Sequence, residues 1–366
     1  MNPITKTLKA CHFLGWKKLW QYVCYQVGLR SGYYRHKTRP QREVFTGEPG
    51  LKPFQCFPSV SEAHQAHAIA QADAVLQGEF HRFGGEPVPL DLNAGSSSLL
   101  WTKLEKQAPE SDLKFIWEPA RFGWAISLAR AYAFSQNPDY AKDFWEKTLS
   151  FLETHPPYLG RQWQSAQEIV IRLMAMVFCD RVFADAPASI PENRLRLWQA
   201  IAEHAQRIPP TLTYARAQNN NHLISEAAGL YTAGVYLPEH PSASKWRAIG
   251  WRWLNRAFQH QINEFGTYTQ HSTNYHRLML QLALFTDHLR REAGDIEWEP
   301  LTRTRLAIAT RWLWALTDPD TGRTPRLGAQ DGAYLFQFAS LPSEDYRPVV
   351  DAAAKAFLDQ DVYGQD

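Results

Sequence analysis

The feature that most constrains this chain is a helical spacing of apolar residues that recurs from Ser61 almost to the end. Apolar positions three and four residues apart indicate amphipathic helices, and the alternation typical of strands is nearly absent. Prolines and glycines punctuate the pattern, among them Pro209-Pro210 and the turn at residues 318–322. The pattern predicts helices over residues 61–77, 119–136, 138–154, 164–185, 193–207, 221–236, 242–262, 272–291, 297–317 and 344–359.

Short connections separate these helices, so each is predicted to turn back against the one before it as an antiparallel hairpin. About ten such helices between roughly residues 60 and 320 predict an all-α fold, an (α/α) toroid whose helix ends meet at a central groove. The chain has no exact sequence repeat, and a plain helical bundle or a solenoid is the alternative.

Residues 1–60 are predicted to form a lead-in that packs on the toroid, and residues 61–366 the toroid domain. The lead-in contains one amphipathic helix, Phe13–Leu29, followed by an irregular stretch over residues 30–60. Lys17 and Lys18 break its apolar run, and no small-residue cleavage site follows, so we interpret it as neither a signal peptide nor a membrane span. The cytoplasm is the default location on that ground, with the periplasm and the extracellular space left open.

The charge balance favours no class of macromolecular partner. Lys and Arg total 39 and Asp and Glu total 37, so no global field points to nucleic acid or a membrane surface. The four cysteines have neither metal nor redox spacing. His64 and His67 have no third ligand near them in sequence, and a solvated helix face is favoured over a metal site. No metal or cofactor is predicted in this chain.

Two polar blocks begin predicted helices at places where a generic core would have aliphatic residues. The first is Asn219-Asn-Asn-His222. The amide of Asn221 could donate to a ligand carboxylate and stabilise an enolate-like intermediate, and His222 could share that role or act as a base. The alternative is an Asn-rich helix cap beside a surface histidine.

The second block is Ser272-Thr-Asn-Tyr-His276. Tyr275 can give a proton to a leaving glycosidic oxygen, and it can remove one as a phenolate if neighbouring groups lower its pKa. The alternative is a core aromatic, because Tyr275 also begins an apolar helix stripe. Together the two blocks indicate a lyase that acts on an acidic sugar.

Two arginines near other polar runs are further candidates. Arg121 follows Trp117-Glu-Pro-Ala, and Arg172 follows the run from Trp163 to Glu168. Either guanidinium could bind a carboxylate or a sulfate as a planar fork. The alternative pairs the two arginines with Glu118 and Glu168 as structural bridges between helices.

With these residues in view, the chain resembles the heparinase II/III family of polysaccharide lyases, in the helical toroid that forms the N-terminal part of that family's members. The resemblance extends over most of the chain. Its motifs are Ala72–Phe80, Phe115–Arg121, Trp163–Arg172, the Asn-Asn-His-Leu block, the Ser-x-x-Tyr-His block and Pro325–Gly332. Phe265-Gly266 and Gln270 depart from the family pattern, which often has Asp-Gly and a Glu at these places.

The resemblance implies β-elimination across the C4–O bond of a polysaccharide that contains uronic acid. It implies that Asn221, with His222, neutralises the uronate carboxylate and that Tyr275 is the proton donor. The base is then Tyr275, His222 or a residue of a second domain. Five further positions are predicted to contact substrate: Trp117, Arg121, Arg172, Gln270 and His276.

The family's toroid is followed by a β-sandwich domain that adds to the active site and often carries a structural metal. That domain is expected in cis, beginning where this sequence stops. Two alternatives are a toroid that binds acidic polysaccharide without turnover, and a toroidal glycoside hydrolase that uses Glu118 and Asp331. The identity of the polymer, its sulfation, endo or exo action and the oligomeric state stay open.

Overall fold

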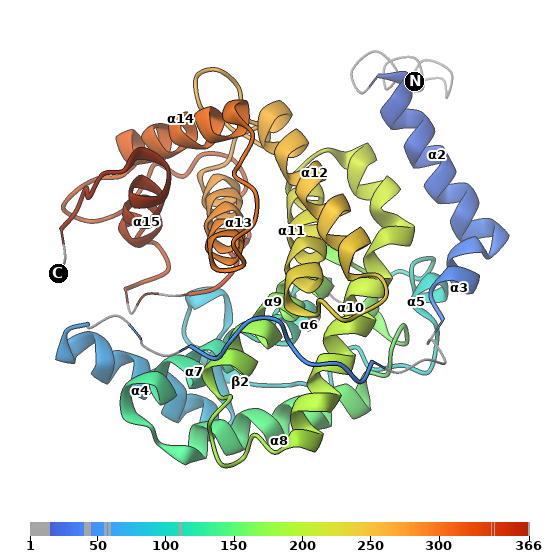
Figure 1. The fold of residues 1–366 in the computed structure, drawn as a ribbon, viewed down its shortest axis with the longest axis horizontal. Coiled ribbons are helices and arrows are strands. Elements are labelled where there is room, and N and C mark those ends of the chain that lie inside the picture. Colours follow the sequence, from blue (N-terminus) through green and yellow to red (C-terminus); the bar gives the residue numbers. More distant parts are fainter. Residues whose placement is uncertain are drawn as a thin grey trace.

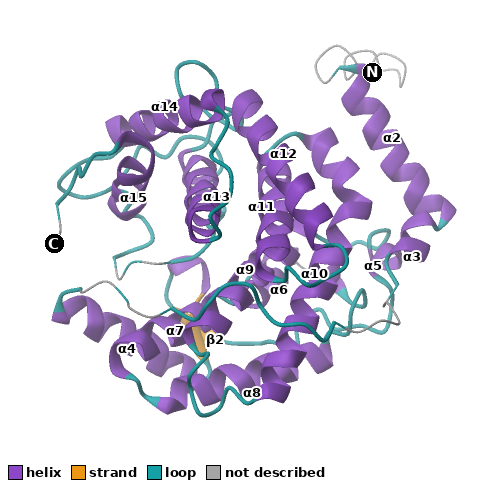
Figure 2. Cartoon of the chain, viewed as in Figure 1, coloured by secondary structure: helices purple, strands orange, loops and turns teal. Residues whose placement is uncertain are grey.

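The computed structural model describes residues 15–39, 45–54, 57, 60–109, 112–337, 339 and 341–364, and most of these residues are helical (Figures 1 and 2). The first part of the chain forms helices α2 (Trp16–Ser31), α3 (Tyr33–Lys37) and α4 (Glu62–Leu76). A short antiparallel pair follows, β1 (Glu79–His81) with β2 (Pro87–Pro89), in which Phe80 faces Val88. Between these strands lies the 3-10 turn η1 (Arg82–Gly84).

Short helices and turns precede or connect four helical hairpins. The short elements are α5 (Trp101–Leu104), α6 (Leu113–Trp117), η2 (Pro119–Arg121) and η3 (Arg161–Trp163). The hairpins are α7 (Gly123–Ser135) with α8 (Pro138–Thr154), α9 (Ala166–Val182) with α10 (Pro191–Gln218), α11 (Asn221–Tyr236) with α12 (Ala243–Gln261), and α13 (Thr273–Glu292) with α14 (Pro300–Leu316). Helix α15 (Arg347–Leu358) packs on the last hairpin.

The hairpins are arranged in two layers. The first helices of the hairpins, α7, α9, α11 and α13, pack one against the next and form an inner layer, and α8, α10, α12 and α14 lie outside them (Figure 1). Helices α9 and α11 are buried on almost every side, which requires apolar or small residues around the whole helix. Gly250 lets α12 approach α11 closely, because a Cβ there would lie 2.5 Å from the backbone nitrogen of Tyr231.

This layering determines the directions of the inner helices. Each outer helix returns the chain to the end where its hairpin began, so the four inner helices run parallel to one another. Their N-terminal turns therefore gather at one rim of the toroid. Each N-terminus carries a partial positive charge from the helix dipole, and the rim is a favourable place for an anion.

The structure confirms the all-α toroid. Each of the ten predicted helices is present, with ends that shift by a few residues. One boundary was wrong: Pro209-Pro210 does not end a helix, and α10 continues to Gln218. Each proline removes only one main-chain donor, and α10 is supported by contacts with α2, α9 and α11 on several sides. Tertiary packing has outweighed the local signal.

The lead-in is more helical than predicted. Helix α2 packs on α10, and α3 occupies part of the stretch that was expected to be irregular; residues 13 and 14 of the predicted first helix lie outside the described residues. Residues 45–54 run across the toroid, where Gly50 donates to the carbonyl of Tyr236 and Phe54 to that of Arg181. The proposed boundary between lead-in and toroid at residues 60/61 stays a prediction.

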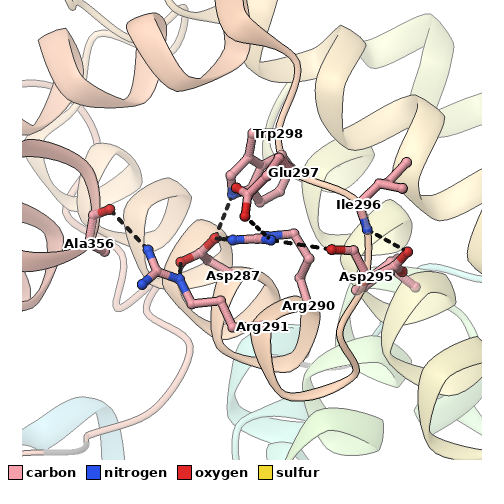
Figure 3. Close-up of polar contacts among 9 residues, drawn as sticks. Asp287, Arg290, Arg291, Asp295, Ile296, Glu297, Trp298 and Ala356 are labelled. Atoms are coloured by element: carbon pink, nitrogen blue, oxygen red, sulfur yellow. Dashed lines mark hydrogen bonds and ion pairs between the residues drawn. The ribbon is translucent and has the colours of Figure 1, made fainter.

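A network of charged side chains fastens the last helices together (Figure 3). Buried Asp287 on α13 accepts hydrogen bonds from Arg290, Arg291 and the indole of Trp298. Arg290 also bonds Glu297 at 2.9 Å, just before α14, and Arg291 donates to the carbonyl of Ala356 on α15. One carboxylate thereby joins α13 to the segment entering α14 and to α15.

Glu226 is a buried carboxyl in the middle of the inner layer. It lies on α11 with 2% of its surface exposed, and its Oε2 has no hydrogen-bond partner among the described residues. Burial raises the pKa of Glu226 from 4.5 to about 8, although nearby Arg207 opposes the shift. The folded protein therefore keeps a proton that the unfolded chain releases.

We expect Glu226 to make folding stability fall as pH rises from about 4.5 to about 8. The raised pKa means that the folded state binds more protons in this window, so the loss is up to about 1.4 kcal/mol per pH unit. Glu226→Gln cannot ionise, and its free energy of unfolding, measured by urea titration across this window, should fall less than that of the wild type. Exposed Glu153→Gln on α8 is the control. Parallel wild-type and Glu226→Gln curves would contradict the assignment.

Candidate functional site

The candidate site lies at the rim where the inner helices begin. Every inner helix contributes at or just before its first turn, and a loop at residues 324–334 lies against the start of α13. The contributing residues are Arg121 before α7, Gln167 and Glu168 on α9, Asn221 and His222 on α11, and Tyr275 on α13. Parallel packing thus brings together residues that are far apart in sequence.

Asn221 is held in place from two neighbouring segments. Its side-chain Nδ2 donates to Oε1 of Gln167 at 2.6 Å, and its backbone N–H donates to Oε1 of Gln270 at 3.1 Å. Asn220 is the N-cap of α11, and its Oδ1 accepts from the backbone N–H of His222. The amide of Asn221 is 4% exposed and has one fixed orientation at the start of the helix.

His222 stands beside Asn221 in a desolvated position. Burial lowers the pKa of His222 from 6.5 to about 4, and the negative charge of Glu168 opposes that shift only partly. The imidazole is therefore neutral at neutral pH. A neutral ring can accept a proton, and it offers no positive charge to a carboxylate.

Arg121 and Glu168 form a bidentate pair across the start of α7 and α9. Nε and Nη2 of Arg121 donate to the two carboxylate oxygens of Glu168 at 2.5 and 2.9 Å, and Nη1 contacts the carbonyl of Gly332 at 3.4 Å. Burial lowers the pKa of Arg121, but Glu168 more than offsets this and the net shift is upward. The alternative that the sequence offered, a structural bridge, thus holds for Arg121. Its hydrogen-bond partner is Glu168, and no such bond to Glu118 is seen among the described residues.

Tyr275 and Asp331 form the second polar pair of the site. The Tyr275 hydroxyl donates to Oδ2 of Asp331 at 2.9 Å, and Nζ of Lys114 reaches the same oxygen at 2.7 Å. Burial, the hydrogen bond and the charge of Asp331 hold the pKa of Tyr275 well above its ordinary value. Burial raises the pKa of Asp331, but the bonds from Lys114 and Tyr275 lower it overall. Tyr275 is therefore a neutral phenol beside a carboxylate.

Glu118 is a buried carboxyl near this rim. Burial raises its pKa to about 7, although Arg121 and a hydrogen bond from the backbone of Phe83 oppose the shift. Its Oε2 is shielded from solvent and has no hydrogen-bond partner among the described residues. Glu118 therefore holds a proton under mildly acidic conditions, but a ligand has no direct path to that oxygen.

Arg172 and His276 are enclosed inside the protein. Arg172 is fully buried and donates to His204 and to the carbonyls of Ala120 and Gln162. His276 is also fully buried; its Nε2 lies 3.0 Å from the carbonyl of Ala309, its ring stacks on Trp312, and burial lowers its pKa to about 4. In this arrangement both side chains join helices to one another.

The other two predicted contact residues also have structural partners. Trp117 ends α6 and donates from its indole to the carbonyl of Arg161 at 3.0 Å. Gln270 accepts from the backbone of Asn221, as described above, and so supports the start of α11. Both side chains are partly exposed.

Sequence reasoning missed the parts played by Gln167 and Lys114. Gln167 stands in the motif that ends at Glu168, yet only its place in the first turn of α9 shows that it faces Asn221. Lys114 is one of many lysines, and its sequence separation from Asp331 hides their contact. Asp331 itself was considered, but for hydrolysis alone.

Two features, a metal-binding cluster and a membrane-spanning helix, are absent from the described residues. Among the described residues, no three His, Cys, Asp or Glu side chains are grouped so that they could hold a metal ion. The His64 ring lies 3.0 Å from the hydroxyl of Ser61, at the cap of α4. Within the same part of the chain, no helix has both the length and the apolar character needed to cross a membrane.

Two curated relatives, both named heparin-sulfate lyase, align with part of the chain. The one from Bacteroides thetaiotaomicron is 28% identical over 163 residues, which cover 43% of this chain and 22% of the relative. The one from Bacteroides stercoris is 24% identical over 188 residues, which cover 46% and 28%. The aligned part thus spans less than a third of either relative's length.

Solved structures share the fold. The crystal structure of heparinase III has a TM-score of 0.57 at 23% identity, covering 83% of this chain and 44% of that one. Heparan sulfate lyase HepC from Pedobacter heparinus has a TM-score of 0.52 at 20% identity, covering 88% and 47%. The chain therefore corresponds to the helical toroid of these proteins and spans less than half of their length.

The family model described as the heparinase II/III N-terminus matches residues 30–298, which include the Asn-His block and the Tyr-His block. The match covers most of the toroid described above. This chain belongs to the heparinase II/III family.

Proposed function

We propose that this chain is the toroid part of a lyase that cleaves a polysaccharide containing uronic acid by β-elimination, with Asn221, His222 and Tyr275 in the catalytic roles. The observation that carries the proposal is that these three residues lie in the first turns of α11 and α13, two inner helices that pack together. The two heparin-sulfate lyases similar to this chain support the reaction class.

Asn221 is assigned to the uronate carboxylate. One N–H of its Nδ2 bonds Gln167, and this bond orients the amide so that the second N–H is the donor for the ligand. The positive end of the α11 dipole supports negative charge at the same place. As the proton beside the carboxylate leaves, charge builds on the carboxylate oxygens, and a fixed donor stabilises that charge without reorganisation.

Tyr275 is assigned as the proton donor to the leaving oxygen. Its raised pKa keeps the phenol protonated, and the carboxylate of Asp331 opposes formation of a phenolate. These facts support the acid role over the base role that the sequence left open. Transfer of the proton to the departing glycosidic oxygen would leave a phenolate, and the Arg121 cation partly offsets the opposing charges of Asp331 and Glu168.

His222 is assigned as the base within this chain. It is neutral at neutral pH because burial lowers its pKa to about 4. A bound uronate would place a negative charge beside the ring and raise that pKa, which makes the imidazole a stronger proton acceptor in the complex. Asn221 then neutralises the carboxylate while His222 removes the adjacent proton.

A glycoside hydrolase is the second candidate, favoured by one observation. The pKa of Glu118 is raised to about 7 while that of Asp331 is lowered, and such a split is typical of an acid and base pair. However, Glu118 is shielded from solvent, and Asp331 is engaged by Lys114 and Tyr275. A sugar would have to open the shielded site of Glu118 and to displace Lys114 and Tyr275 from Asp331. Elimination is therefore the better supported reaction.

We expect Tyr275→Phe to reduce elimination by about 10²–10⁴-fold, because a general acid contributes on this order. Affinity for uronate oligosaccharides should change little, since the carboxylate is held by Asn221. The full-length protein is assayed for unsaturated products by ultraviolet absorbance and for binding by calorimetry. Exposed Tyr33→Phe on α3 is the matched control.

Three outcomes of that assay separate the candidate functions. Retained elimination in Tyr275→Phe would remove Tyr275 from the chemistry. New reducing ends without an absorbing double bond in the wild type would favour the hydrolase. Saturable binding of uronate oligosaccharides with no turnover in the wild type would favour a binding module without catalysis.

We expect Asp331→Asn to shift the alkaline limb of the elimination profile to lower pH. The limb reports loss of the Tyr275 proton, and removing a negative neighbour makes that proton easier to lose. The pKa of Tyr275 is followed independently by the phenolate absorbance. The difference between the wild type and Tyr275→Phe is compared with the difference between Asp331→Asn and Asp331→Asn/Tyr275→Phe. An unchanged limb together with an unchanged phenolate titration would contradict the coupling of Asp331 to Tyr275.

A further inference from the structure

A pocket of about 260 Å³ opens beside the candidate site. Its walls come from the first turn of α13, through Asn274 and Arg277, and from the segments at residues 323–334 and 343–346. Gly332 on its wall accepts from Nη1 of Arg121 at 3.4 Å, so the pocket adjoins the candidate site. None of the roles assigned above uses this pocket.

Two deeply buried donors on its wall lack a partner. Asn274 is 3% exposed and Arg277 is 8% exposed, and within the described part of the chain neither Asn274 Nδ2 nor Arg277 Nε has a hydrogen-bond acceptor. The remaining bonds of Arg277, to Ser343 and to Oδ1 of Asn274, fix its guanidinium in the wall. Both atoms are shielded from solvent, so neither contacts a ligand directly, and Arg277 contributes the positive charge of its fixed guanidinium to the wall.

The charge of the pocket favours an anionic ligand. Arg323 and Arg326 line the pocket with exposed side chains, and neither guanidinium has a hydrogen-bond or salt-bridge partner among the described residues. With Arg277 the wall holds three guanidinium groups, against the single exposed carboxylate of Glu344 among the described lining residues. The N-terminus of α13 adds its positive dipole end. Planar guanidinium forks match the oxygens of a sulfate or a carboxylate.

We propose that this pocket binds an oxyanion carried by the substrate, a sulfate ester or a second carboxylate on a sugar unit next to the one that is cleaved. The proposal rests on the proposed function for the position of the cleaved unit. Asn274 and Arg277 form the buried floor of the subsite, and Arg323 and Arg326 close on the anion from the loop. The pocket thus selects acidic saccharides by their charge pattern beyond the reacting uronate.

The test measures binding to the full-length protein with Tyr275→Phe as background, so that no turnover occurs. The probes are an O-sulfated tetrasaccharide that contains uronate and its O-desulfated counterpart, titrated by calorimetry. Arg323→Ala/Arg326→Ala should weaken binding by about tenfold or more, since two charge-assisted contacts are lost. Arg252→Ala, an exposed arginine on α12 outside the pocket, is the matched control and should leave binding unchanged.

The pattern of loss identifies the anion. Weaker binding of the sulfated probe alone assigns the pocket to sulfate, and equal weakening of both probes assigns it to a carboxylate. Unchanged binding of both probes overturns the proposal. Because both arginines are exposed, the double variant is expected to keep the wild-type melting temperature, and Arg326→Glu should give a larger loss by charge reversal.

A second measurement needs no saccharide. Inorganic sulfate should raise the melting temperature of the wild type in a saturable way relative to chloride at equal ionic strength, and the double variant should lose that saturable part. Sulfate also stabilises proteins by exclusion from their surface, but that effect is shared by both proteins. An identical response in both proteins would count against the pocket. Absence of elimination on every uronate polymer, with sulfate binding intact, would overturn the proposed function and leave an anion-binding pocket.

Discussion

The structure depends on the parallel direction of its four inner helices. Each hairpin sends an outer helix back along the toroid, so α7, α9, α11 and α13 begin at the same rim. Four helix N-termini then direct their positive dipole ends toward one region. Asn220 and Ser272 cap two of these helices, and the side chains that follow them carry the candidate chemistry. The fold thereby gathers four positive dipole ends at one rim in a chain with almost balanced charge.

Burial at this rim moves the pKa values of His222 and Tyr275 in opposite directions. Desolvation keeps His222 neutral, and desolvation together with Asp331 keeps the Tyr275 phenol protonated. In the proposed reaction, His222 and Tyr275 then serve as base and acid at the same pH, which is the requirement for removing one proton while delivering another. The bond from Lys114 lowers the pKa of Asp331 and keeps this carboxylate charged. The charged Asp331 in turn keeps the Tyr275 phenol protonated.

Buried arginines link the rim to the rest of the toroid. Arg172 and Arg207 lie among carbonyls, aromatic rings and hydroxyls, and each spans more than one element. Arg121 differs because its bidentate partner Glu168 lies on the rim itself. From sequence Arg121 and Arg172 looked alike, since each stands near a polar run. Their burial and partners, which depend on residues far along the chain, separate the structural arginines from the one beside the site.

The sequence by itself determined the all-α class, the hairpin succession and the two polar blocks, because helix periodicity, caps and breakers act over a few residues and are written locally. It also identified Asn221, His222 and Tyr275 as candidates, first by the chemistry of these blocks and then by the resemblance to the heparinase II/III family. Only the tertiary structure decided that α10 continues through its prolines, that His276 and Arg172 are enclosed, and that Gln167, Lys114 and Asp331 surround the candidates. These outcomes depend on contacts between distant segments, and such contacts exist only once the inner helices have packed in parallel.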